Sequence, residues 1–549
     1  MSNLQPNETI ADRVPHDAPG TLEIGFSVPE RYNASAILFD NLSQGRANRI
    51  AVTGPAGTRC YADLCQDAAR FGHALLSLGL KRGDRVLLFL DDTPAYPAAL
   101  FGAIHSGLVP VLINTLTPPD LLQFYLVDSD AAVAITDAEF ADRFSAAACE
   151  QTHLHTLLVV NGAVPTAAPV RAVATASWLA QFPPTLNAAD THRDDMAFWM
   201  YSSGSTGRPK GVVHLQHDMA YTQASYGRHR LWLTPDDICY SVPKIFFAYG
   251  FGNSITFPFA VGASSVLTSG QPRPAAIFET IARYRPSVFF GLPTLYTALT
   301  KAPEVEQADL KSLRLCVSAA EVLAIEVFNR WKAVSGLEIM EGLGSTEALH
   351  IYLSNTEGRK KLGAAGQRVE GYEIILKDAG GREVAADGEE GILWVRGDSN
   401  TPCYWNRPDK TAETIREGGW IYTGDRFIRD ADSFYFFRGR ADDLVKVSGQ
   451  WVYPLEVELC LADHPDIREC AVMAIELEDR RTTLKAFVVM NIPVTDPKAM
   501  TQRLQDHVKC RLLPYKYPRL IEFRDELPKT GTGKIDRQAL LRRPPAPAA

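Results

Sequence analysis

The N-terminal part of the chain alternates short apolar runs with longer helical patterns. The runs at residues 86–90, 109–113 and 133–136 have the length of buried strands, whereas residues 95–105 and the stretch TPPDLLQFYL suit helices. Strands that are joined by a helical crossover lie parallel in one sheet. The segment therefore predicts a βαβαβ layer built on a parallel sheet.

A second layer of the same kind is predicted from Asp237. The order there is strand (ICYSV), apolar stretch (FAYGFGNSITFPFAVG), strand (SSVLT), helix (PAAIFETIARY) and strand (SVFFG). The two segments look like a duplicated α/β layer, although their sequences share little identity. After Gly366, short segments separated by turn dipeptides such as Asp387-Gly388 predict antiparallel hairpins, and hence a β subdomain.

The pattern changes once more after Arg440, where helix and strand patterns alternate in PLEVELCLADH, CAVMAIEL and LKAFVVM. We therefore place a domain boundary at residues 440–443. The predicted organisation is an N-terminal arm (1–30), a large domain (31–440), a small domain (441–540) and a disordered tail (541–549).

Composition limits the classes of partner. The 549 residues are 46% hydrophobic and 22% charged with a formal charge of -8, so we expect neither nucleic acid nor a membrane as partner. The start does not look like a signal or transit peptide, and the most apolar stretch, AALFGAIHSGLVPVLINTL, is interrupted by polar residues. Nine cysteines without a C-x-x-C pair predict free thiols. A cytoplasmic protein is expected.

A Gly-, Ser- and Thr-rich stretch, YSSGSTGRPKG at residues 201–211, predicts an anion site. Glycine lets backbone N–H groups approach a ligand, hydroxyl groups donate hydrogen bonds, and Arg208 and Lys210 add charge. The stretch lies between the strand-like runs AFWMY and GVVHL and lacks P-loop spacing. Standing alone, it would equally suit a surface turn. His214 and His217 follow it, but without the glutamate of H-E-x-x-H they do not predict a metal site.

Four further motifs carry charged residues. EGLGSTE offers the Glu347 carboxylate, which suits Mg²⁺, because this cation binds carboxylate and phosphate oxygens. YTGDR offers Asp425 as an acceptor for ribose hydroxyls, and RGRADD offers Arg440 as a donor. PKTGTGKIDR places Lys534 in a Gly-rich loop. Singly, each of these residues is more often part of a solvated turn.

In this order and spacing, the motifs resemble the adenylate-forming superfamily of acyl-CoA synthetases, nonribosomal adenylation domains and luciferases. The resemblance runs from about residue 30 to about residue 540, and KIFFAYGFGN, EGLGSTEALHIYLSN and YKYPR are most similar to benzoate-CoA ligases and their aryl relatives. It implies an α/β fold. A large N-terminal domain of two doubly wound α/β subdomains plus a β-barrel-like subdomain would be followed by a small, mobile α+β C-terminal domain.

The resemblance also implies a ligase of aromatic compound metabolism that works in two half-reactions. An aromatic acid, benzoate or a substituted benzoate, attacks ATP with Mg²⁺ as cofactor to give acyl-AMP and pyrophosphate, and the thiol of coenzyme A (CoA) then displaces AMP. A carboxylate is a poor electrophile until its oxygen belongs to a good leaving group, which explains the need for ATP. Cations and N–H donors must offset the repulsion between carboxylate and triphosphate.

The family pattern assigns roles to residues of this chain. Thr346 is expected to contact the α-phosphate, Glu347 to bind Mg²⁺, and Lys534 to bridge the acyl carboxylate and α-phosphate. With an ordinary pKa of about 10.4 a lysine is charged at pH 7, so an electrostatic role is expected for Lys534 rather than proton transfer. The remaining residues of the implied ATP and AMP site are Ser202, Ser203, Gly204, Ser205, Thr206, Gly207, Lys210, Ala320, Glu321, Gly344, Ser345, Asp425 and Arg440.

The implied acyl pocket suits a ring of benzoate size, because its residues are aromatic or small. They are Phe247, Ala248, Tyr249, Gly342, Leu343 and His350. An isolated Phe-Phe-Ala-Tyr run would otherwise be assigned to the core. The chain departs from the family at Ala320, where glycine is usual, and at Ala324, where proline is common, which leaves the ring substituent open.

In the family the small domain rotates between the half-reactions, exchanging the Lys534 face for the face carrying KVSG. Asp442 matches the hinge, although a turn or helix-cap role fits equally, and Gly449, with Lys446 and Ser448, matches the CoA tunnel. We also hypothesise that acetylation of Lys534 would block adenylation and spare thioester formation.

Three other readings compete with a CoA ligase. One alternative is a stand-alone aryl-acid adenylation enzyme, which would load a carrier protein in trans. Another is a luciferase-like oxygenase, but the sequence has no motif beyond the shared ones that points to oxygen chemistry. A degenerate scaffold would be expected to lack Glu347 or Lys534, which are both present. A homodimer and a monomer both remain open.

Overall fold

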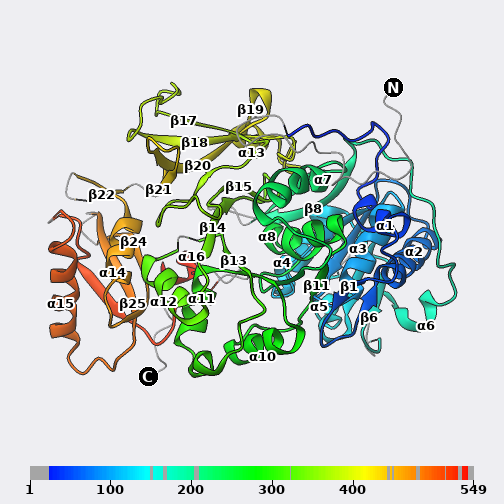
Figure 1. Ribbon diagram of the computed structural model, residues 1–549, viewed down its shortest axis with the longest axis horizontal. Helices are drawn as coiled ribbons and strands as arrows, with labels where there is room; N and C mark the ends of the chain where they lie inside the picture. Colours follow the sequence, from blue (N-terminus) through cyan, green and yellow to red (C-terminus); the bar gives the residue numbers. More distant parts are fainter. Residues whose placement is uncertain are drawn as a thin grey trace. The chain divides into compact units, whose positions relative to one another are not determined.

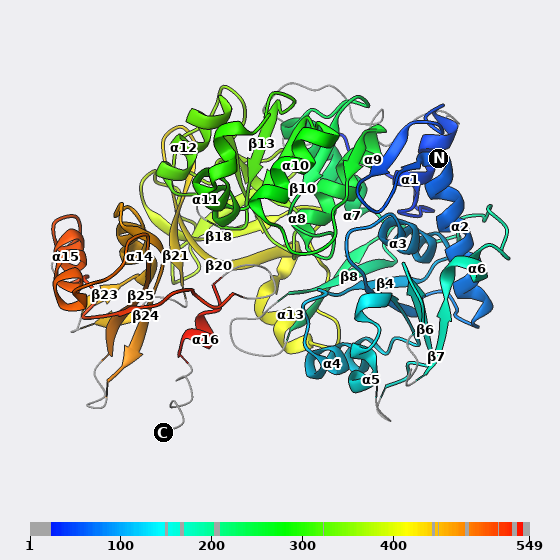
Figure 2. The same ribbon diagram turned by 90° about the horizontal axis from the view of Figure 1, so that it is seen from below.

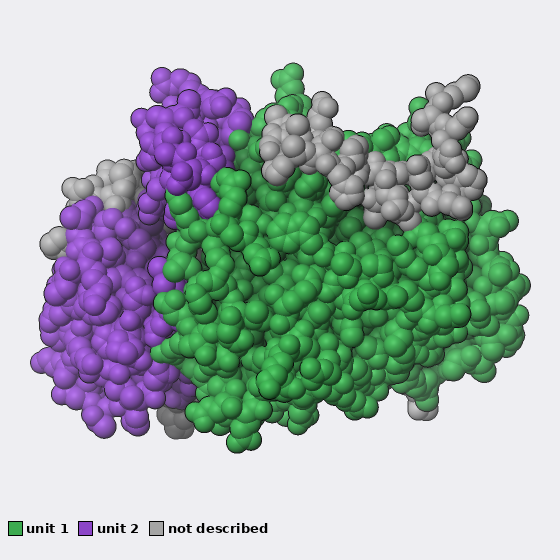
Figure 3. Space-filling view, in the orientation of Figure 1, with its two compact units in different colours: residues 1–323, 327–374, 394–422 green, residues 324–326, 375–393, 423–549 purple. Residues whose placement is uncertain are grey.

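The structure is a computed structural model, and it describes residues 24–148, 152–164, 170–202, 209–321, 323–441, 445–447, 450–477, 482–513, 515–529 and 535–541. The chain divides into two compact units (Figure 3). One comprises residues 1–323, 327–374 and 394–422, and the other comprises residues 324–326, 375–393 and 423–549. The domain boundaries expected from the sequence stay predictions. None of the helices in the described ranges combines the length and apolarity that crossing a membrane requires.

A seven-stranded sheet with the order β7-β6-β5-β3-β4-β8-β9 forms the first α/β layer (Figure 1). Its strands are β3 (Arg85–Phe89), β4 (Val109–Leu112), β5 (Val133–Asp137), β6 (Thr156–Val160), β7 (Arg171–Ala174), β8 (Met196–Ser202) and β9 (Lys210–Leu215). All neighbours are parallel except β8 and β9. Its helices are α2 (Tyr61–Ser77), α3 (Ala95–His105), α4 (Pro119–Ser129), α5 (Arg143–Ala147) and α6 (Thr175–Leu179). The predicted βαβαβ layer is confirmed.

Strand β3 is apolar from Val86 to Phe89 because both faces of this sheet are covered. Val86 and Leu88 belong to a hydrophobic core with residues of α2 and α3. Leu87 and Phe89 belong to another core with residues of α4 and α5, and the Phe89 and Phe144 rings lie 5.7 Å apart. Successive side chains of a strand point to opposite faces, so α3 and α4 lie on opposite sides of the sheet (Figure 2). The layer is doubly wound, as the resemblance implied.

A nine-stranded sheet with the order β16-β15-β14-β13-β12-β10-β11-β1-β2 forms the predicted second layer. Its strands are β1 (Ile50–Thr53), β2 (Arg59–Cys60), β10 (Ile238–Ser241), β11 (Ser264–Val266), β12 (Val288–Gly291), β13 (Leu315–Ser318), β14 (Ile339–Gly344), β15 (Ile351–Ser354) and β16 (Gln367–Arg368). The strands from β14 to β1 in this order are parallel, and β2, β15 and β16 pair antiparallel.

The helices of this part of the chain include two π-helical segments. The α-helices are α1 (Ala36–Ser43), α7 (Asp218–Thr222), α8 (Ala248–Phe251), α9 (Phe257–Val261), α10 (Pro274–Tyr284), α11 (Pro293–Lys301) and α12 (Ile325–Ser335), and the π-helices are η3 (Gln223–Leu231) and η4 (Gly252–Thr256). The apolar stretch FAYGFGNSITFPFAVG thus forms α8, η4 and α9 in succession. Segments of π-helix often lie at functional sites.

A five-stranded sheet forms the predicted β subdomain. It has the order β17-β18-β20-β19, with β21 paired to β20. The bounds are β17 (Glu373–Lys377), β18 (Glu390–Arg396), β19 (Ile415–Arg416), β20 (Trp420–Arg429), β21 (Tyr435–Arg440) and the nearby helix α13 (Pro408–Thr414). In β18, buried Leu393 and Val395 alternate with partly exposed neighbours, which is the pattern of a strand with one covered face.

The last part of the chain is a small α+β assembly. Strands β24 (Ile467–Glu476), β25 (Thr482–Met490) and β26 (Leu520–Phe523) form one sheet, and β22 (Val445–Val447) and β23 (Gln450–Val452) form a hairpin. The helices are α14 (Pro454–Ala462), α15 (Pro497–Lys509) and α16 (Arg537–Leu541). The Asp496 carboxylate accepts two backbone N–H groups at the start of α15, each at 3.0 Å, an N-cap that stabilises a helix by about 1 kcal/mol.

Candidate active site

The hairpin of β8 and β9 holds the two ends of the predicted phosphate loop together. Ser202 and Lys210 are direct partners across this antiparallel pair, as the two flanking strand-like runs indicated. The Lys210 Nζ lies 4.1 Å from the centroid of the Tyr404 ring, a cation–π contact that orients the ammonium group. Ser203, Gly204, Ser205, Thr206, Gly207 and Arg208 lie outside the described residues, so their contacts with phosphate stay a prediction.

A turn between β14 and β15 carries Thr346 and Glu347. The Ser345 hydroxyl stabilises it by accepting a backbone N–H at 3.2 Å. A Cβ atom at Gly344 would lie 2.4 Å from the His350 carbonyl oxygen, so a larger residue would displace the backbone. The turn therefore holds these side chains at the end of a buried parallel strand, where α/β folds bind their ligands.

A buried histidine anchors the same turn. His214 Nε2 donates to the Thr346 carbonyl at 2.9 Å, and its Nδ1 lies 2.8 Å from Asp218 Oδ2. Neither side chain of this pair is exposed. His214 thus positions the backbone of Thr346, a role that the sequence analysis did not assign. The available signal was the spacing of four between a histidine at a strand end and an aspartate in the next helix.

Glu347 lies at the hydroxyl end of Tyr404. The Tyr404 Oη donates to Glu347 Oε1 at 2.7 Å, and the Glu347 carbonyl accepts the Thr401 N–H at 2.7 Å. No other hydrogen bond from a described residue reaches this carboxylate, so its second oxygen has coordination capacity. Within the described ranges no group of three His, Cys, Asp or Glu side chains is placed to hold a metal. One carboxylate with phosphate oxygens is a usual Mg²⁺ environment, and Glu347 fits it.

Aromatic rings surround His350, where the acyl pocket is expected. The centroid of its ring lies 4.6 Å from that of Phe257, 5.0 Å from Tyr226 and 5.7 Å from Tyr249. Burial lowers the pKa of His350 to about 3, so the imidazole is neutral. Among the described residues, no hydrogen-bond partner reaches either ring nitrogen of His350 or the hydroxyls of Tyr226 and Tyr249.

The other predicted acyl residues lie on two elements next to this cluster. Ala248 begins α8, the helix that carries Tyr249, and Phe247 is its N-cap residue. Gly342 and Leu343 belong to β14, whose partner strand β15 starts directly after His350. A Cβ atom at Gly342 would lie 2.9 Å from a side-chain methyl of β15, so only glycine leaves this contact undisturbed.

Two contacts with the first layer anchor the segment before α8. The Lys244 Nζ lies 2.6 Å from Asp91 Oδ1, and the Ile245 N–H donates to Asp92 Oδ1 at 3.2 Å. Burial raises the pKa of Asp92 to about 7, although the Lys244 charge opposes this. Residues at the ends of β3 and β10 thereby fix the start of the predicted acyl-lining segment.

Ala320, where this chain departs from the family, has a strained backbone conformation. Ala320 has a φ of +73°, in the left-handed region where glycine is the residue without strain. Its side chain is exposed, so no packing offsets the strain. The neighbouring Glu321 carboxylate accepts the Thr294 N–H at 3.3 Å, which holds the segment in place.

Ala320→Gly is expected to stabilise the protein by about 1 kcal/mol, because it removes left-handed strain and leaves the exposed surface unchanged. Chemical denaturation followed by tryptophan fluorescence measures the change. Ala319→Gly is the matched control, since Ala319 is 2% exposed and lacks a positive φ. That variant is expected to be destabilised, and equal effects of the two substitutions would contradict the strain argument.

The predicted ribose-binding pair is assembled on a hairpin. Asp425 of β20 and Arg440 of β21 are cross-strand partners, and the Arg440 Nη1 lies 3.1 Å from Asp425 Oδ1. The two side chains are 18% and 40% exposed, so a ligand can reach both. Their contact with ribose or phosphate stays a prediction.

The predicted residues of the small domain fall mostly outside the described ranges. Asp442, Ser448, Gly449 and Lys534 are not described, and Lys446 is described only as a backbone position of β22. Their roles as hinge, CoA tunnel and catalytic lysine stay predictions.

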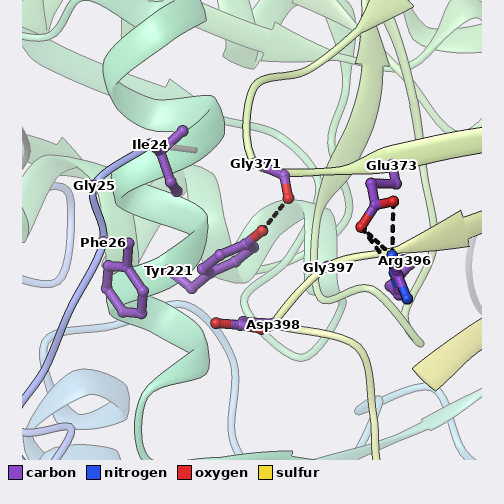
Figure 4. Close-up of a pocket in the computed structure, with 9 residues that line it drawn as sticks. All are labelled: Ile24, Gly25, Phe26, Tyr221, Gly371, Glu373, Arg396, Gly397 and Asp398. Carbon is purple, nitrogen blue, oxygen red and sulfur yellow. Dashed lines mark hydrogen bonds and ion pairs between the residues drawn. The ribbon is translucent and has the colours of Figure 1, made fainter. Parts of the chain in front are cut away.

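A surface hollow of about 520 Å³ has none of the predicted site residues in its lining (Figure 4). It is lined by Ile24, Gly25, Phe26, Tyr221, Gly371, Glu373, Arg396, Gly397 and Asp398. The Tyr221 hydroxyl donates to the Gly371 carbonyl, and Arg396 pairs with Glu373. Because these polar groups already bind one another, the hollow is a weaker candidate than the turn at Glu347.

A doubly wound α/β layer, a second largely parallel sheet, a hairpin whose second strand begins with Lys210 and a Thr-Glu turn beside an aromatic cluster are the arrangement of an adenylate-forming enzyme. The family model "AMP-binding enzyme" matches residues 39–405, and "AMP-binding enzyme C-terminal domain" matches residues 456–534. The chain belongs to this family, and it is an AMP-forming acid–thiol ligase.

Similar proteins include several ligases of aromatic acids. The benzoate-CoA ligase of Thauera aromatica is 42% identical over 93% of this chain and 96% of its own length. The 4-hydroxybenzoate-CoA/benzoate-CoA ligase of Rhodopseudomonas palustris is 39% identical over 93% of this chain and 94% of its own length. The crystal structure of the anthranilate CoA ligase AuaEII in complex with anthranoyl-AMP has a TM-score of 0.87 and 37% identity, covering 93% of this chain and 97% of that chain.

Proposed function

We propose that the protein activates benzoate or a small substituted benzoate to acyl-AMP and then to the aryl-CoA thioester, with release of pyrophosphate and AMP. The observation that carries this proposal is one hairpin. Strands β14 and β15 and their turn carry Thr346 and Glu347 of the expected nucleotide site together with Gly342, Leu343 and His350 of the expected acyl pocket. An acid in that pocket would present its carboxylate next to the group that binds the α-phosphate.

In the first half-reaction the carboxylate oxygen attacks the α-phosphorus, and pyrophosphate departs. Thr346 is held by His214 and contacts the α-phosphate, while Lys210 offsets charge on the departing phosphates. Glu347 would hold Mg²⁺, and the bound cation would neutralise part of the triphosphate charge. Lys534 holds the carboxylate against the phosphate, and Asp425 and Arg440 bind the ribose. The second half-reaction follows rotation of the small domain, when the CoA thiol displaces AMP.

The aromatic residues around the expected acyl pocket favour a small ring. Tyr226, Tyr249, Phe257 and neutral His350 offer flat apolar surface. Their hydroxyls and ring nitrogens lack described partners, and leaving a buried polar group unpaired costs about 1–3 kcal/mol. A hydroxyl or amino group on the ring would satisfy one of them, so hydroxybenzoates and aminobenzoates belong with benzoate among the substrates to test.

The test is pyrophosphate release from ATP and Mg²⁺ with benzoate, hydroxybenzoates, 2-aminobenzoate, halobenzoates, cyclohexanecarboxylate, cinnamate and octanoate, each with and without CoA. The expected result is turnover that requires CoA and prefers small aryl acids. Adenylate formation that ignores CoA and stops after about one equivalent would instead support an enzyme that loads a carrier protein. Preference for octanoate would contradict the pocket assignment.

A further inference from the structure

Tyr404 contacts two oppositely charged residues of the expected site. Its hydroxyl donates to Glu347 Oε1 at 2.7 Å, while the Lys210 Nζ lies over its ring, 4.1 Å from the centroid. Lys210 and Glu347 therefore both contact Tyr404, one at its ring and the other at its hydroxyl, and they do not form an ion pair with each other. All three residues belong to the same compact unit.

The surroundings of Tyr404 fix its ring and its backbone. The residue is 2% exposed, and its hydroxyl donates to the Glu347 carboxylate. Its backbone forms an antiparallel bridge with Val212, and its N–H donates to the Thr411 hydroxyl at 3.0 Å. The next residue donates its N–H to the Gly211 carbonyl at 2.7 Å. Backbone contacts thus join Tyr404 to strand β9, which begins with Lys210.

The phenol prevents the two charges from cancelling each other. A lysine and a glutamate that contact each other directly gain Coulomb energy as an ion pair. Such a pair would occupy the carboxylate that a cation needs. The hydroxyl holds the carboxylate at one end of the ring, and the electron-rich face holds the ammonium. The Glu347 carboxylate thereby keeps its second oxygen for a cation, while the ring orients the Lys210 ammonium.

We infer that Tyr404 is a positioning residue that couples metal binding at Glu347 to phosphate binding at Lys210, an inference that rests on the proposed function. Tyr404→Phe removes the hydroxyl and keeps the ring. We expect the concentration of Mg²⁺ needed for half-maximal pyrophosphate release to rise about tenfold, since a hydrogen bond to a charged group is lost. Thioester formation from supplied aryl-AMP and CoA should not change.

Binding measurements test the inference without turnover. Mn²⁺ binding in the presence of ATP, followed by electron paramagnetic resonance, should weaken about tenfold in Tyr404→Phe. Tyr61→Phe is the matched control, because the Tyr61 hydroxyl is fully buried and donates to the Ala263 carbonyl at 2.6 Å in the core. It should lose similar stability and keep wild-type Mn²⁺ binding.

Two results would overturn the positioning role. One is unchanged Mn²⁺ binding and Mg²⁺ dependence in Tyr404→Phe. The other is an equal loss of both half-reactions that follows the melting temperature in both tyrosine variants, which would indicate a purely structural residue. If the wild-type protein released no pyrophosphate with any acid, the proposed function would fail, whereas the Mn²⁺ measurement would still decide the coupling at Tyr404.

Discussion

Glu347→Gln is expected to slow adenylation by about 10²- to 10³-fold, the usual cost of removing one group that stabilises developing charge. Glutamine keeps an oxygen that can accept from Tyr404, so the hydrogen bond at Glu347 Oε1 is preserved in form. The negative charge that attracts Mg²⁺ is lost. Rapid-quench measurement of aryl-AMP formation at saturating ATP gives the rate, and raising the Mg²⁺ concentration should restore part of it.

Glu341→Gln is the matched control, since Glu341 lies in the same strand as the residues that precede the turn. Burial raises the pKa of Glu341 to about 8, so its side chain is largely neutral at pH 7 and glutamine resembles it closely. Glutamine also keeps an oxygen that can accept the Leu323 N–H, which the Glu341 carboxyl accepts at 3.3 Å. We expect near wild-type adenylation. Equal losses in the two variants would show that the effect comes from the strand and not from the Glu347 charge.

The sequence predicted the strands of the sheets well, because the burial of a strand on both faces shows directly in its own residues. Strand β3 is buried on both faces, so every residue from Val86 to Phe89 is apolar, and the helices between strands have ordinary lengths. The stretch after Phe247 was harder, because α8, η4 and α9 follow one another without a polar face. Gly252 explains part of this, since a Cβ atom there would lie 2.3 Å from the His350 ring.

Site residues could be proposed from the sequence only where a motif carries them. Thr346, Glu347 and Lys210 were proposed because glycines and hydroxyl residues surround them in the order of the family motifs. Tyr404 lies 57 residues from Glu347, and His214 lies 132 residues from Thr346. Such contacts depend on how the layers pack. The four-residue spacing of His214 and Asp218 is a signal for that pair, but no spacing in the sequence indicates that His214 meets Thr346 or that Tyr404 meets Glu347. The strain at Ala320 was equally hidden, because only its φ distinguishes it from an ordinary alanine.

Lys534→Gln is expected to separate the two half-reactions. Adenylation should fall by about 10²- to 10³-fold, because the lost ammonium can no longer offset the repulsion between the carboxylate and the α-phosphate. Thioester formation from supplied benzoyl-AMP and CoA should keep its rate, since in that step a neutral acyl-AMP carbonyl meets a thiol and no triphosphate is present. Pyrophosphate release measures the first step, and the loss of free CoA thiol measures the second.

Lys534→Arg is the matched control for charge, and it should retain more adenylation than Lys534→Gln, although the fork of a guanidinium does not reproduce the point charge of an ammonium. Glutamine also imitates acetyl-lysine, so a selective loss of adenylation would make acetylation at Lys534 a chemically sufficient way to stop the enzyme before ATP is consumed. If the rates of both half-reactions fell equally, Lys534 would act in the thioester-forming step as well as in adenylation. The assignment of one face of the small domain to each step would then be wrong.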